Sequence, residues 1–140
     1  MAEFKTNVMR ILEKAKINYT AHEYPHGKEA VDGVSVAKLL GQNPECVFKT
    51  LVTKGVSGGY FVFVVPVAEE LDLKKAAKSV GEKSVEMIHV KDINSITGYI
   101  RGGCTPLGMK KQFPTVVDSS AEKYDKIIIS GGRIGSQIIL

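Results

Sequence analysis

Two stretches of the chain have apolar residues spaced as on one face of an α-helix. In the first stretch the apolar positions are Val8, Ile11, Leu12 and Ala15. In the second stretch they are Leu73, Ala76, Ala77 and Val80. Asp72 precedes the second stretch and Gly81 follows it, and these residue types cap the beginning and the end of helices. We therefore predict two amphipathic helices, with the apolar residues of the second turned inward.

Other stretches are rich in β-branched and aromatic residues, which favour strands. The clearest pair is residues 49–53 and 60–66, and the glycine-containing stretch between them predicts a hairpin turn. Further strands are predicted at residues 19–24, 84–88, 115–118, 126–130 and 137–140, and short helices at residues 35–40, 44–48 and 90–96. This irregular mixture indicates an α+β fold with a mixed, mostly antiparallel β-barrel-like sheet and surrounding helices.

Composition narrows the class of protein. The chain has 140 residues, so we expect residues 1–140 to form a single domain. No apolar run is long enough to cross a bilayer, and the N-terminus lacks the apolar core of a signal peptide. The two cysteines lie far apart in no metal or redox spacing, so we expect a cytoplasmic protein. A net charge of +4 permits a polyanionic partner without requiring one.

A glycine-rich loop between residues 96 and 111 is the first candidate for a binding site. Its glycines and its proline are Gly98, Gly102, Gly103, Pro106 and Gly108. Adjacent glycines leave backbone amides open to a ligand, and the flanking cations favour an anion. Those cations are Arg101, Lys110 and Lys111. A solvated surface loop is the alternative interpretation.

Outside this loop, few side chains are candidates for catalysis or for binding a ligand. In a strand, Lys49 would share a face with Val47 and Leu51, so it either extends to solvent or points into a ligand pocket. Cys104 has no base nearby in sequence and is interpreted as a packed loop residue. His22 and His26 have the spacing of a helical metal pair, but Tyr24 and Pro25 between them are incompatible with a helix. We predict no metal and no other cofactor.

Four motifs in register give the chain a family resemblance. They are residues 48–51 (Phe-Lys-Thr-Leu), residues 66–75 with their Leu-Asp-Leu-Lys-Lys end, residues 97–108 around the glycine pair, and Ser130 with Gly131 and Gly132. Together they resemble the YbaK/EbsC family, and within it the YbaK-type Cys-tRNA(Pro) deacylases. The resemblance runs from the first helix to the last residue, and it implies a mixed barrel with helices around it, as in the editing domain inserted in prolyl-tRNA synthetases.

What the resemblance implies about function is specific. Such proteins hydrolyse the ester of mischarged tRNA, the YbaK type acting on Cys-tRNA(Pro) together with prolyl-tRNA synthetase. The family's invariant lysine corresponds to Lys49, which would hold the 3′ acceptor end, while Gly102 and Gly103 would offer amides to the developing oxyanion. Substrate-binding positions fall on Tyr24, Phe48, Thr50, Arg101, Ser130 and Gly131. In the YbaK type the substrate's own thiol is believed to attack its ester, so Cys104 would be a bystander.

Two alternatives stay open from the sequence. The substrate could be another mischarged tRNA such as Ala-tRNA(Pro), or the chain could be a non-catalytic RNA- or protein-binding regulatory module. Two departures from the family pattern are also visible. Thr105 stands where serine is common, and the chain stops at Leu140, where relatives continue into a further helix.

Overall fold

The computed structural model describes residues 7–23, 41–99, 104–109, 113–132 and 136–140. The α-helices are α1 (Asn7–Lys14), α3 (Leu73–Ser79) and α4 (Ile93–Thr97), and the 3-10 helices are η1 (Pro44–Cys46), η2 (Val90–Asp92) and η3 (Ser119–Lys123). The strands are β1 (Thr20–Glu23), β2 (Phe48–Gly55), β3 (Tyr60–Pro66), β4 (Val85–Met87), β5 (Thr115–Val117), β6 (Ile128–Ser130) and β7 (Ser136–Ile139). Among the described helices none is long and apolar enough to span a membrane.

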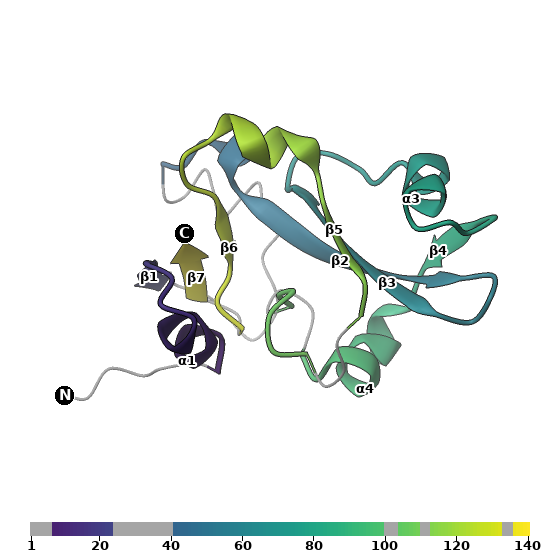
Figure 1. The fold of residues 1–140 in the computed structure, drawn as a ribbon, viewed down its shortest axis with the longest axis horizontal. Coiled ribbons are helices and arrows are strands. Elements are labelled where there is room, and N and C mark those ends of the chain that lie inside the picture. The colour runs from purple at the N-terminus through teal and green to yellow at the C-terminus, as the bar shows by residue number, and fades with distance from the viewer. Residues whose placement is uncertain (1–6, 24–40, 100–103, 110–112, 133–135) are drawn as a thin grey trace.

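The strands form two sheets (Figure 1). One has the order β1-β7-β6, with both pairings antiparallel. The other has the order β4-β2-β3-β5, antiparallel except for the parallel pair β3–β5. The predicted α+β class with a mixed, mostly antiparallel sheet is therefore confirmed. The described strands curl without closing into a complete barrel.

Strand β2 connects the two sheets because its second edge has two different neighbours. One edge pairs with β3 from Phe48 to Lys54. On the other edge, Val47 forms a parallel bridge to Ile128 of β6, and β4 pairs only with residues 53–55. No described strand pairs with residues 49–51 from this side. Among the described strands, this stretch of the β2 edge between β6 and β4 is therefore open.

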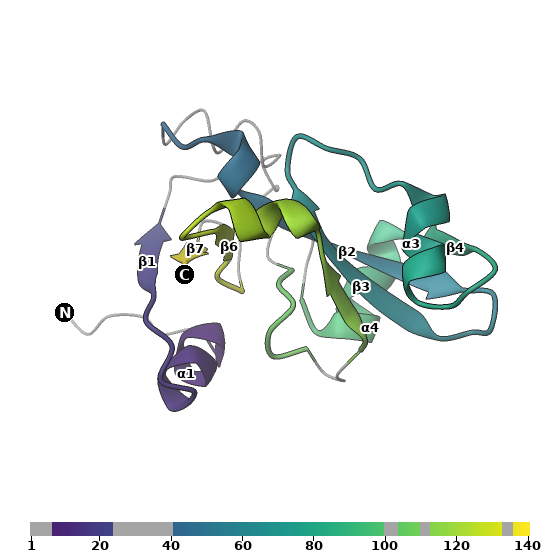
Figure 2. The same cartoon turned by 45° about the horizontal axis from the view of Figure 1, so that its top comes forward.

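The two faces of the β2–β3 hairpin carry separate hydrophobic cores. On one face Phe63 packs against Ala76 and Ala77 of α3. On the other face Phe48 and Val64 pack with α1 and with Ile129 and Ile138 of the smaller sheet. Figure 2 shows α3 in front of the hairpin and α4 behind it, so helices cover both faces.

Several local predictions are confirmed, and one is wrong. The carboxylate of Asp72 accepts hydrogen bonds from the amides of Lys74 and Lys75, which caps α3 as predicted. Gly98 ends α4 with a φ of 87°. Leu73, predicted to face inward, is 40% exposed, because the first residue of this short helix lies beyond the edge of the core formed by Ala76 and Ala77.

Two further differences concern short helices. Helix η3 at Ser119–Lys123 was not predicted; the Asp118 carboxylate begins it by accepting a hydrogen bond from the Ser120 amide. The helix predicted at residues 35–40 lies outside the described residues. The helical turn predicted at residues 44–48 is present as η1, with the Asn43 side chain capping the Glu45 amide.

Candidate functional site

The two sheets meet at a parallel bridge close in sequence to Lys49 and Ser130. Val47, which immediately precedes β2, and Ile128 of β6 form this bridge. Lys49 and Ser130 each lie two residues further along, and side chains two residues apart share a face of a sheet. Adjacent strands are about 5 Å apart. The fold thus brings together two predicted site residues that are 81 positions apart in the sequence.

The hydroxyl of Ser130 is oriented by the turn that follows it. Its Oγ accepts a hydrogen bond of 3.2 Å from the amide of Gly132, whose φ of 102° suits glycine. Because this bond uses Oγ as an acceptor, the hydroxyl proton remains available for donation to a ligand. Gly131 is equally constrained, since a Cβ there would lie 2.2 Å from Oγ of Ser136. The turn therefore positions one donor near the junction of the two sheets.

A pair of glutamines that the sequence analysis missed lies next to Ser130. Gln137 of β7 is directly opposite Ser130 in the ladder and is only 5% exposed. Nε2 of Gln42 donates to Oε1 of Gln137 at 2.8 Å, and Nε2 of Gln137 donates back at 3.3 Å. Because Gln42 lies just before η1, the pair ties the segment leading into β2 to the smaller sheet. The two glutamines are 95 positions apart in the sequence, so no local pattern signals their pairing.

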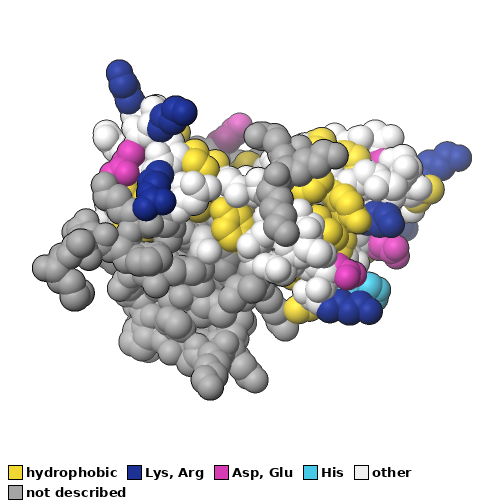
Figure 3. All heavy atoms as spheres, turned by 90° about the horizontal axis from the view of Figure 1, so that it is seen from below, with side chains coloured by type: hydrophobic (Ala, Val, Ile, Leu, Met, Phe, Trp, Pro, Cys, Tyr) yellow, Lys and Arg dark blue, Asp and Glu magenta, His cyan; other side chains and the backbone are white. Residues whose placement is uncertain are grey.

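The opposite face of β2 is apolar. Thr50 lies at the open strand edge and, with Cys104 and Ile93, helps to line a cavity of 260 Å³. Two hydrophobic side chains of its lining are strongly exposed, Met87 at 43% and Val90 at 57%. Seen from the side of α4, hydrophobic side chains gather near charged ones of both signs (Figure 3). Thr50 and Cys104 are therefore neighbours of an open apolar hollow.

Cys104 is a poor nucleophile in this environment. Burial raises the pKa of its thiol to about 11, and a hydrogen bond with the Thr97 side chain lowers it by less. A thiol with this pKa is almost entirely protonated at neutral pH, whereas nucleophilic cysteines have lowered pKa values. The pKa of Tyr99 is also raised, first by burial and then by the nearby Cys104. This environment fits the interpretation of Cys104 as a packed residue.

The segment that carries Cys104 is held against α1. The hydroxyl of Tyr99 donates a hydrogen bond of 2.5 Å to the carbonyl of Leu107. Gly108 has a φ of 73°, and a Cβ there would lie 2.8 Å from Nδ2 of Asn7 and 3.0 Å from Cδ1 of Ile11. The glycine therefore allows the end of the loop to touch the helix, and these contacts fix residues 104–109 relative to β2.

The remaining predicted site residues have different positions. Phe48 is 3% exposed and packs in the core with Val64, so it supports β2 from the face opposite Lys49. Thr105 is fully buried, and its hydroxyl has no hydrogen-bond partner within the described ranges. The other predicted positions lie outside the described residues; they are Tyr24, Arg101, Gly102 and Gly103.

Comparison with known proteins identifies the family. Residues 28–140 match the model of the aminoacyl-tRNA editing domain. The chain is 50% identical over 136 residues to "Putative Cys-tRNA(Pro)/Cys-tRNA(Cys) deacylase EbsC" of Enterococcus faecalis, covering 97% of this chain and 83% of that protein. This identity over nearly the whole length extends the match to the N-terminal helix.

Solved structures share the fold at lower identity. One is described as a putative trans-editing enzyme for prolyl-tRNA synthetase; it has a TM-score of 0.81 at 22% identity and covers 99% of this chain and 88% of its own. Another, the hypothetical protein APE2540, has a TM-score of 0.84 at 22% identity and covers 95% and 87%. These structures share the fold, and the sequence matches agree with the resemblance seen in the sequence. This chain belongs to the aminoacyl-tRNA editing domain family.

Proposed function

We propose that the protein is a trans-editing deacylase that removes cysteine from mischarged Cys-tRNA(Pro). The observation that carries the proposal is the bridge between Val47 and Ile128, which joins the segments that carry Lys49 and Ser130 where the two sheets meet. Family membership and the printed name of the Enterococcus faecalis relative support the substrate class. The work of such a site is to position one ester and to stabilise charge, which requires few side chains.

Each described residue has a proposed role. The ammonium group of Lys49 holds a phosphate or the ribose at the 3′ end of the tRNA. Ser130 donates its free hydroxyl proton to the aminoacyl group, and the Gln42–Gln137 pair fixes the strands that carry both residues. The amides of Gly102 and Gly103 are proposed to receive the oxyanion. Arg101, Tyr24, Thr50 and Gly131 remain proposed substrate-binding positions.

The bond-breaking step uses the substrate's own thiol. Its sulfur bonds to the ester carbonyl carbon, the bond to the tRNA oxygen breaks, and that oxygen takes up the thiol proton. The product is a cyclic thiolactone, which water then opens to free cysteine. The raised pKa of Cys104 supports this scheme, because a protonated, packed cysteine is a poor protein nucleophile.

The test is the release of labelled amino acid from Cys-tRNA(Pro), Ala-tRNA(Pro) and Pro-tRNA(Pro). We expect rapid loss of cysteine alone, with kcat/KM reduced about 100-fold in Lys49→Ala. Lys54→Ala is the matched control, because Lys54 lies exposed on the same strand at the opposite face. Hydrolysis of Ala-tRNA(Pro) would favour the alternative substrate and make thiol assistance inessential. Survival of all three esters with prolyl-tRNA synthetase present would contradict the deacylase proposal and favour a binding module.

The cellular setting follows from the substrate. A deacylase for charged tRNA acts where translation takes place, so we propose a cytoplasmic protein. Prolyl-tRNA synthetase is the proposed partner, because a net charge of +4 supports weak, salt-sensitive tRNA binding. Addition of the synthetase is then expected to lower KM for Cys-tRNA(Pro), and to do so more strongly at higher salt.

A further inference from the structure

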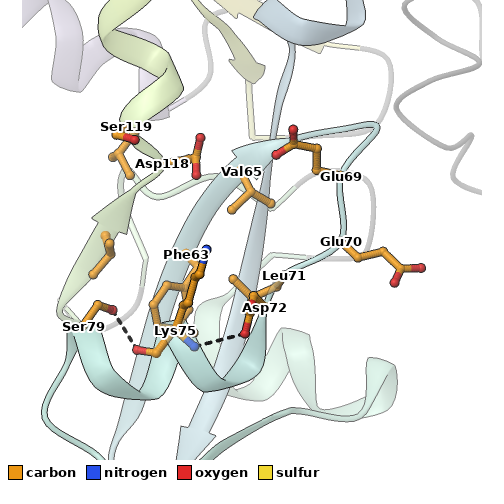
Figure 4. A pocket seen from close by; sticks show the side chains of 13 residues that line it. Phe63, Val65, Glu69, Glu70, Leu71, Asp72, Lys75, Ser79, Asp118 and Ser119 are labelled. Carbon is orange, nitrogen blue, oxygen red and sulfur yellow. Dashed lines mark hydrogen bonds between the residues drawn. The ribbon is translucent and has the colours of Figure 1, made fainter.

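The apolar cavity beside Thr50 lies against the edge of β2 as well as against one of its faces. Three consecutive residues of β2 line it, Thr50, Leu51 and Val52. Successive side chains of a strand point to opposite faces, so a cavity on one face alone touches every second residue. The hollow beside α3 shows that pattern, because the residues of β3 that line it are Phe63 and Val65, two positions apart (Figure 4). The cavity of 260 Å³ therefore reaches the main chain of β2.

Hydrogen bonds of the neighbouring strands show which main-chain groups of β2 face the cavity. The carbonyl of Val64 accepts a hydrogen bond from the amide of Asp118, so it points toward β5. Thr50 lies opposite Val64, and opposite residues of an antiparallel pair exchange both hydrogen bonds or neither. The amide and the carbonyl of Thr50 therefore point to the open edge. The main chain of Val52 points the same way, because its carbonyl accepts a hydrogen bond of 3.2 Å from the amide of Ile88.

Three of these main-chain groups have no partner among the described residues. They are the amide and the carbonyl of Thr50 and the amide of Val52, since β4 pairs with β2 only at residues 53–55 and the bridge to β6 is at Val47. Main-chain groups that border an apolar cavity without a partner cost free energy. A ligand that brought its own donor and acceptor to this edge would recover that cost.

The remaining walls of the cavity are apolar. They are formed by Met87 and Ile88 at the end of β4, by Val90 of η2 and by Ile93 of α4. Met87 and Val90 are strongly exposed, so a flat ring placed against them would remove apolar area from water. The thioether of Met87 also favours contact with an aromatic ring. The cavity is smaller than the usual site for a complete ligand, which fits one ring system.

A nucleobase combines these properties in one group. Its faces pack against apolar side chains, and its edge carries adjacent hydrogen-bond donors and acceptors. The deacylase proposal, on which this inference rests, brings one base to this place, because the aminoacyl ester is attached to the ribose of the terminal adenosine of the tRNA. Thr50 is the neighbour of Lys49, which is proposed to hold that 3′ end, and the two side chains point to opposite faces of β2.

We propose that this cavity binds the terminal adenine of the charged tRNA. The 6-amino group donates to the carbonyl of Thr50, and N1 accepts from the amide of Val52. The ring packs against Met87 and Val90. The ribose then lies across the edge of β2, with the preceding phosphate on the side of Lys49. The main chain of β2 thereby binds the base, while a side chain of the same strand binds the backbone of the tRNA.

The first test is an NMR titration of the ¹⁵N-labelled full chain with adenosine at up to millimolar concentration. We expect the amide signals of Thr50 and Val52 to shift. Purine riboside is the matched ligand, because it lacks only the 6-amino group and keeps the ring. It should bind about fivefold more weakly than adenosine, since one hydrogen bond is lost.

The second test trims the apolar wall. The double variant Met87→Ala/Val90→Ala should weaken adenosine binding about fivefold. It should also raise KM for Cys-tRNA(Pro) with little change in kcat, because the base is bound equally in the ground state and the transition state. The control Val56→Ala/Leu73→Ala trims two exposed hydrophobic side chains elsewhere and should leave both quantities within about twofold. Thermal unfolding of both double variants should match the wild type.

Every other outcome of these titrations overturns the proposal. Equal affinities for adenosine and purine riboside would show that the ring packs without a hydrogen bond to β2, and equal weakening by both double variants would show an effect unrelated to the cavity. Deacylation of Cys-tRNA(Pro) without adenosine shifts in β2 would remove this inference and leave the proposed function standing. Adenosine shifts in β2 with intact Cys-tRNA(Pro) would remove the deacylase and leave the adenine site.

Discussion

The two faces of β2 differ in chemistry although they share a single strand. One face carries Lys49 near the junction with the smaller sheet, where Ser130 and the buried Gln137 pair with each other. The other face places Thr50 beside Cys104 in an apolar hollow. Because successive side chains of a strand point to opposite faces, the neighbouring residues Lys49 and Thr50 lie on different sides of β2. The open edge of β2 therefore offers a polar side for charged groups and an apolar side without an ionised thiol.

This difference shows which interactions hold each face in position. The polar face depends on hydrogen bonds between segments far apart in the chain, above all the Gln42–Gln137 pair. The apolar face depends on close packing of residues 104–109 against α1. Variants can therefore disturb the two faces separately, and the four that follow are ordered from the largest expected effect to the smallest.

The largest effect is expected for Gly108→Ala on the apolar side. The new Cβ would meet Asn7, Tyr99 and Ile11 at 2.8–3.0 Å, at a φ of 73°. Strain and overpacking should together lower the free energy of unfolding by about 3 kcal/mol, measured by urea denaturation. Gly58→Ala is the control, since Gly58 has a φ of 95° in open space and should cost only about 1 kcal/mol. Equal losses would mean that residues 104–109 do not pack on α1.

Gln137→Leu should be the most damaging change on the polar side. It leaves the half-buried amide of Gln42 without its partner, which should cost about 1.5 kcal/mol of unfolding free energy. The double variant Gln42→Leu/Gln137→Leu removes both amides and should recover part of that loss, giving a coupling energy of about 1 kcal/mol in a double-mutant cycle. Additive losses would contradict the reciprocal hydrogen bonds.

Ser130→Ala separates chemistry from stability on the polar face. Loss of the hydrogen bond from the Gly132 amide should lower the unfolding free energy by about 1 kcal/mol. Loss of the donated proton should lower kcat/KM for Cys-tRNA(Pro) about tenfold. The matched control is Ser79→Ala, whose hydroxyl donates to the Ala76 carbonyl within α3. That variant should lose similar stability and no activity; a parallel loss of activity would remove Ser130 from the site.

The smallest effect on activity is expected for Cys104→Ser, less than about twofold in kcat/KM. In the wild type, the rate of Cys104 alkylation by iodoacetamide should rise with pH up to about 11. The folded pKa is above the ordinary value of 9.0, so the native state retains the thiol proton longer than the unfolded chain does. Stability should therefore be unaffected by this group below about pH 9 and decrease between pH 9 and 11. Cys104→Ser should remove that decrease, and a large loss of activity in this variant would contradict its bystander role.

Local chemistry was readable from the sequence, whereas long-range pairing was not. The Asp72 cap, the Gly98 helix end and the β2–β3 hairpin all depend on residues within a few positions of one another, and the structure confirms them. Lys49 was singled out because a lysine on an apolar strand face is unusual. Its neighbour Ser130 came from family resemblance alone, and Gln137 was missed. The division of the β2 edge between β6 and β4 arises from pairings that no local pattern encodes.

The order of the smaller sheet has a consequence for how the protein is made. Its central strand β7 (Ser136–Ile139) comes last among the described strands, and both β1 and β6 pair with it. Ribosomes add residues from the N-terminus onward, so β1 must wait for more than a hundred residues of synthesis. The partner of Gln42 also emerges only in that last segment. The polar face of β2 is therefore completed only after β7 has emerged from the ribosome, and a nascent chain that stops short of Ser136 lacks the partner of Gln42.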